Sequence, residues 1–115
     1  EVATTSASRK YESWAWRIKG ESATARRAWG EAEDALGRAR AFAEAIGQPR
    51  LKWMSQLATG RLHAALGRRE GALGHYRAAW AMIAGLRERT HDAALRVGLE
   101  SVPLIREVED LARPE

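Results

Sequence analysis

Apolar side chains recur every three or four positions along most of this chain, which is the spacing of one face of an α-helix. The clearest such stripe belongs to the segment 30–46 and ends at Gly47-Gln48-Pro49. Glycine readily takes the left-handed conformation that ends a helix, and proline suits the first turn of the next one. The apolar positions of this stripe are Ala32, Leu36, Ala39, Ala43 and Ile46.

Similar periodicity elsewhere predicts an all-α chain built from antiparallel helical hairpins. Alanine, leucine, arginine and glutamate, which favour helix, dominate the composition. We expect residues 1–9 to be a linker or disordered segment, residues 10–89 to hold two hairpins, and residues 90–115 to hold a pair of capping helices and a tail. The predicted helices are 10–27, 30–46, 50–66, 69–87, 93–99 and 103–112, with Thr90 as the N-cap of the fifth.

The segment 57–86 is the most complete hairpin. Its break lies at Gly67-Arg68-Arg69-Glu70, between two apolar runs. Small residues at Gly60, Ala64 and Ala72 would let the two backbones approach closely. The residues that we expect to fill the seam are Leu66, Leu73, Tyr76, Trp80 and Ile83.

The order Gly60, Gly67, Ala72, Tyr76, Ala79 resembles the tetratricopeptide repeat, in which glycine, glycine, alanine, an aromatic residue and alanine stand at these spacings. An internal match supports this resemblance, although its offset of 40 positions exceeds the usual period of about 34 residues. The pairs at this offset are Gly20 and Gly60, Ala32 and Ala72, Leu36 and Tyr76, and Ala39 and Ala79.

The C-terminal segment 86–111 looks like the end of the helical arrays in large bacterial ATP-dependent and LuxR-type transcriptional regulators. Because the chain starts with Glu1 rather than methionine, we expect a fragment of a larger bacterial protein. This second resemblance implies an alternative function, that of a sensor or regulatory segment in a multidomain signalling protein.

The net charge of +4 and the pI near 10.1 would suit an acidic partner. The arginines are interleaved with acidic residues along every predicted helix, which is typical of a solvated surface and makes nucleic acid an unlikely ligand. No run approaches the roughly 20 apolar residues of a membrane span, so we expect no membrane association and a cytoplasmic location.

Residues for catalysis or metal binding do not form a recognisable pattern. The chain has no cysteine, and His63, His75 and His91 lack the spacing of a metal-binding helix motif. Carboxylates at Glu31 and Glu33, and at Glu107 and Asp110, stand among arginines, so we predict surface ion pairs. We therefore expect a chain that is not an enzyme and that needs no metal and no cofactor.

In tetratricopeptide proteins the first helix of each repeat lines a concave groove, so the resemblance implies a groove that binds a protein or peptide. Aromatic, methionine and arginine side chains are enriched at such interfaces. Packing against a neighbouring repeat is the alternative role for these positions. A third hypothesis is a homodimer that pairs through Trp14 or Trp16. The predicted groove residues are Trp14, Arg17, Glu21, Thr24, Met54, Leu57 and Arg61.

Overall fold

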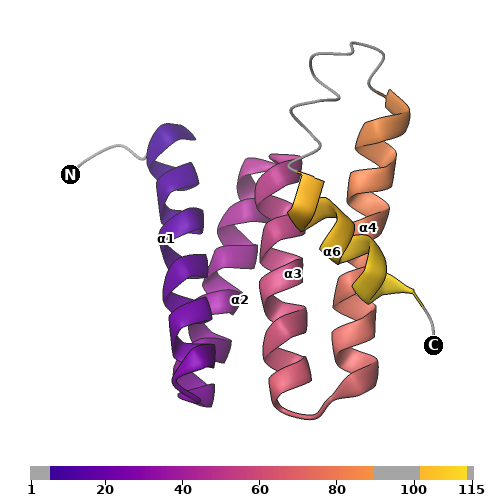
Figure 1. Cartoon of the computed structure of the whole chain (residues 1–115). Coiled ribbons are helices and arrows are strands. Elements are labelled where there is room, and N and C mark those ends of the chain that lie inside the picture. Colours follow the sequence, from indigo (N-terminus) through magenta and orange to yellow (C-terminus); the bar gives the residue numbers. More distant parts are fainter. Residues whose placement is uncertain (1–5, 90–101, 114–115) are drawn as a thin grey trace.

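A computed structural model describes residues 6–89 and 102–113, and these residues are entirely helical apart from short turns. The all-α prediction is confirmed. The helices follow one another side by side in chain order, with α1 at one edge and α6 against α4 at the other (Figure 1). They are α1 (Ser6–Ala25), α2 (Trp29–Ile46), α3 (Pro49–Ala65), α4 (Arg69–Arg89) and α6 (Val102–Ala112).

Each of the three turns within residues 6–89 contains one residue in the left-handed conformation. Gly47 after α2 has φ 76° and Gly67 after α3 has φ 80°, as the glycine signals predict. The turn after α1 uses Arg27 instead, with φ 62°. A left-handed residue with a side chain is uncommon, and this one gave no signal in the sequence.

The predicted helix ends are within two residues of the observed ones, with one exception. Helix α1 begins at Ser6, so residues 6–9 belong to the helix and the predicted linker 1–9 is wrong over that part. Serine and alanine in this segment tolerate helix, and the segment simply extends a helix that packing stabilises further along. The predicted short helix 93–99 and the Thr90 N-cap lie outside the described residues.

The first hairpin, α1 and α2, closes around a glycine. A Cβ at Gly20 would lie 2.5 Å from Leu36 Cδ2, so only glycine permits this approach of the two helices. Helix α3 completes the cluster from the other side. Its buried members are Ala23, Ala32, Leu36, Ala58 and Leu62.

The second hairpin, α3 and α4, closes in the same way. A Cβ at Gly60 would lie 2.6 Å from Tyr76 Cε1. Ala64, which we expected to help this approach, is exposed instead, because it lies on the outer side of α3. Helix α6 covers the second hairpin, and the buried members of the joint cluster are Trp53, Leu57, Ala72, Tyr76, Ala79, Ile83, Ile105, Val108 and Ala112.

None of the helices within residues 6–89 and 102–113 has the length and apolar content that a membrane crossing requires.

Candidate interaction surface

The predicted groove residues lie on two helices, α1 and α3, and the two groups differ in their burial and contacts. Of the α1 group, Trp14 is exposed at 47% of its surface, while Arg17 is only 9% exposed. Glu21 and Thr24 are half-buried. The aromatic ring is therefore accessible to a partner, whereas the polar positions beside it are largely engaged within the chain.

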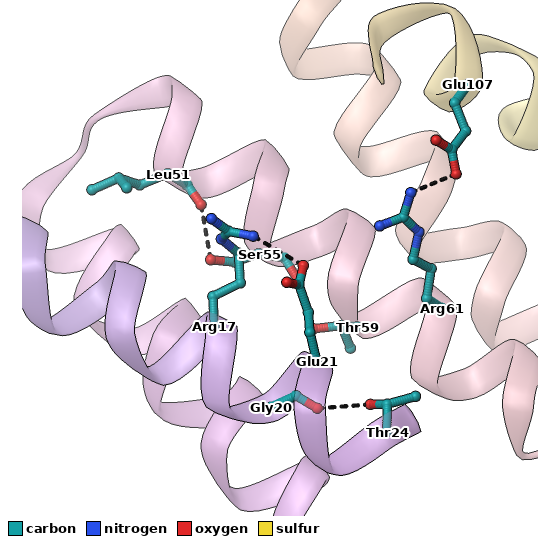
Figure 2. Close-up of polar contacts among 9 residues, drawn as sticks. All are labelled: Arg17, Gly20, Glu21, Thr24, Leu51, Ser55, Thr59, Arg61 and Glu107. Atoms are coloured by element: carbon teal, nitrogen blue, oxygen red, sulfur yellow. Dashed lines mark hydrogen bonds and ion pairs between the residues drawn. The ribbon is translucent and has the colours of Figure 1, made fainter. Parts of the chain in front are cut away.

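The polar positions of α1 bond within their own helix. Arg17 Nη1 donates to Glu21 Oε2 at 2.9 Å, and the Thr24 hydroxyl donates to the carbonyl oxygen of Gly20 at 2.8 Å. Figure 2 shows the Arg17 guanidinium pointing along α1 toward Glu21. Because a charged pair with few exposed atoms is costly to separate, a partner would have to replace this bond to recruit Arg17.

The neighbouring hydroxyl groups of α3 also form hydrogen bonds within their own helix. The Ser55 hydroxyl donates to the carbonyl oxygen of Leu51, and the Thr59 hydroxyl donates to that of Ser55, both at 2.8 Å. Ser55 and Thr59 are buried, and α1 contacts α3. The hydroxyl donors of Ser55 and Thr59 are therefore already used within α3.

The α3 group of predicted residues faces α6. Leu57 is 2% exposed in the cluster that α6 completes, and Met54 packs against the same cluster. Arg61 forms an ion pair with Glu107 on α6, which Figure 2 shows bridging the two helices. In this conformation Leu57 is therefore closed to a partner and Arg61 is already paired, while Met54 is half-buried.

The largest exposed apolar side chains described in the structure lie together on α1. They are Tyr11, Trp14 and Ile18, with exposed fractions of 65%, 47% and 41%. Their spacing places them on one face of the helix, and the Tyr11 and Trp14 rings lie 5.8 Å apart. We call these three residues the α1 stripe. Sequence reasoning singled out only Trp14, although the spacing of three and four was visible in the sequence.

Trp16 points to a different face of α1 from Trp14, as their separation of two positions requires. Lys19 Nζ lies 5.0 Å from the centre of its ring and the Arg38 guanidinium lies 4.9 Å away. The ring is half-buried beneath these cations. Of the two residues that we predicted for pairing, Trp14 is thus the more exposed.

Two histidines meet in the seam of the second hairpin. The His63 and His75 ring centroids lie 4.9 Å apart, and His75 Nδ1 lies 2.6 Å from Gln56 Oε1. Burial lowers the pKa of His75 below its ordinary value, and the charges of His63 and Arg40 lower it further. Both side chains are half-buried between α3 and α4.

The carboxylates considered for catalysis form ion pairs on the surface, as predicted. The groups of three or more His, Cys, Asp or Glu side chains that could hold a metal ion are absent from the described part of the chain. The pairs are Glu31 with Arg26, Glu33 with Arg68, Glu107 with Arg61, and Asp110 with Arg113.

Comparison with protein-family models, with curated proteins and with solved structures gives no match to this chain, so its function is inferred from the surface itself.

Proposed function

We propose that this chain is a non-enzymatic protein-binding module, a short α-solenoid of the tetratricopeptide type that binds a partner protein or peptide. The observation that carries this proposal is the α1 stripe. Tyr11, Trp14 and Ile18 expose large apolar surfaces on one helix face. Aromatic residues with accessible apolar surface are the residues that contribute most to protein–protein binding.

The contrast with α3 supports this assignment. Position 58 on α3 stands 40 residues after Ile18, and Ala58 is buried against Leu36 of the first hairpin. The corresponding face of α1 lacks such a neighbour among the described residues, so its apolar side chains face solvent. An exposed stripe of this kind marks a surface that another protein covers.

The test is capture of partners from a lysate of the source cells by the chain and by a Trp14→Asp, Ile18→Glu variant. The control is Ala41→Asp, Ala45→Glu, which adds the same charges with the same spacing at exposed positions of α2. A partner held by the parent and the control but lost by the stripe variant supports the proposal. Equal capture by all three would reject the stripe as the binding surface.

Self-association is the second candidate, and the same exposed stripe favours it. Two copies that pair through α1 would remove Tyr11, Trp14 and Ile18 from water together. Sedimentation measured from micromolar to millimolar concentration separates the two candidates. A dimer that the Trp14→Asp, Ile18→Glu variant abolishes would show that the stripe binds a second copy of the chain. A monomer at every concentration would indicate that the stripe binds a different protein.

A further inference from the structure

Helix α6 lies on the second hairpin in the manner of a bound peptide. Ile105, Val108 and Ala112 stand at the spacing of one helix face, and all three are buried against α3 and α4. Leu104 and Leu111 flank them and are partly buried. An amphipathic helix whose apolar face fills a hydrophobic seam is a common mode of peptide recognition.

Two arginines of the hairpin define the orientation of α6. Arg61 on α3 pairs with Glu107 in the middle of α6, and Arg77 Nε on α4 donates to the carbonyl oxygen of Ala112 at 3.3 Å. The last carbonyls of a helix carry partial negative charge, so an arginine there favours one direction of the helix. The seam therefore favours a helix that carries an apolar stripe and an acidic residue beside it, and it favours one direction of the helix axis.

Helix α6 follows α4 at a greater separation along the sequence than the other helices follow one another. Short turns hold α2 to α1 and α4 to α3, whereas residues 90–101 separate α4 from α6. The Arg61 and Glu107 side chains are both more than a third exposed. Helix α6 is thus held mainly by its apolar face, and a competing helix with the same face can replace those contacts.

We propose that the α3/α4 seam is a docking site for an amphipathic helix of a partner protein, and that α6 is an intramolecular ligand that occupies the site until such a helix displaces it. The partner helix would carry the pattern of α6, with apolar residues at the positions of Ile105, Val108 and Ala112 and a carboxylate at that of Glu107. This inference rests on the proposed function and adds the class of ligand and its regulation.

The test is binding of a fluorescently labelled peptide with the sequence of residues 102–113 to the full chain, measured by anisotropy. The parent chain should bind weakly because its own α6 competes. A Val108→Asp variant, whose α6 cannot remain buried at that position, should bind the peptide at least tenfold more tightly. Unchanged binding by a variant that keeps its helical circular dichroism would overturn the proposal.

Charge reversal tests the register. In the Val108→Asp chain, adding Arg61→Glu should weaken binding of the parent peptide severalfold. A peptide that carries Glu107→Arg should restore the affinity. Arg68→Glu is the matched control, because Arg68 pairs with Glu33 on α2 and not with α6. Equal effects of the two arginine substitutions would contradict the proposed register.

A second variant, with a substitution on the surface, tests the proposal if Val108→Asp does not fold. Glu107→Arg in the full chain places like charges beside Arg61 without entering the core, and it should raise the affinity for the parent peptide severalfold. No increase would overturn the proposal, and sedimentation showing chains that exchange α6 with each other would assign the seam to a second copy instead. If the peptide does not bind while partner capture through the α1 stripe persists, the docking site is rejected and the proposed function is not.

Discussion

The two hairpins close by the same device and differ in what covers them. Gly20 meets Leu36 in the first, and Gly60 meets Tyr76 in the second. The exposed face of α1 carries Trp14, whereas Trp53 on α3 is buried in the cluster that α6 completes. Tryptophan on the first helix of a hairpin is therefore surface or core according to its neighbours, and residue type alone does not decide which.

The largest expected effect tests this difference between the two tryptophans. Trp53→Ala should lower the free energy of unfolding by about 3–5 kcal/mol, since it empties a buried site. Trp14→Ala should cost less than about 1 kcal/mol, as is usual for surface positions. Urea denaturation followed by circular dichroism measures both. Similar losses would show that the α1 face is covered in solution.

The next largest effects on stability are expected at the glycines where two helices make close contact. Gly60→Ala should cost about 1–3 kcal/mol because its Cβ would overlap the rigid ring of Tyr76. Gly20→Ala should cost a similar amount, because its Cβ would lie 2.5 Å from Cγ of the fully buried Leu36. Gly74 has open space around its Cβ position, so Gly74→Ala should stabilise α4 by about 0.5–1 kcal/mol. Thermal unfolding of the three variants ranks them, and a stabilising Gly60→Ala would contradict the close approach.

A smaller effect depends on pH and centres on His75 in the second hairpin. Burial, His63 and Arg40 hold the pKa of His75 below its ordinary value of 6.5. The unfolded chain then binds the proton at a higher pH than the folded chain. Stability should be complete above pH 6.5 and decrease as the pH falls through the folded-state pKa. The variant His75→Gln should flatten this part of the profile, and an unchanged profile would exclude His75 as its source.

The smallest effect concerns the ion pair that joins α3 to α6. Arg61→Ala should cost less than about 1 kcal/mol, because both side chains are more than a third exposed. The difference from the parent chain should shrink in high salt. Denaturation curves at low and high ionic strength measure this change. A loss that salt does not reduce would indicate that Arg61 acts through packing rather than charge.

Helix ends were largely predictable because their signals are local. Gly47 and Gly67 end helices in the left-handed conformation at the predicted positions. Pro49 stands in the first turn of α3. The start of α1 at Ser6 was missed because serine is more typical of caps and turns than of helix interiors, and packing of the following turns decides how far such a helix extends.

The candidate site was only partly predictable. Trp14 was identified, and the spacing of Tyr11 and Ile18 could have completed the stripe. The burial of Leu57 and the ion pair of Arg61 could not be foreseen, because both depend on α6, whose residues lie far along the chain. The same apolar stripe on α6 would suit any hydrophobic seam, and its periodicity does not specify which one.

The sequence by itself determined that the described chain is helical and where most of its helices end, since these depend on neighbours within a few turns. Only the tertiary structure decided that Trp14 is exposed, that Leu57 is buried and that Arg61 pairs with Glu107. Those outcomes depend on contacts between helices distant in sequence, and helical periodicity defines an apolar face without defining what covers it.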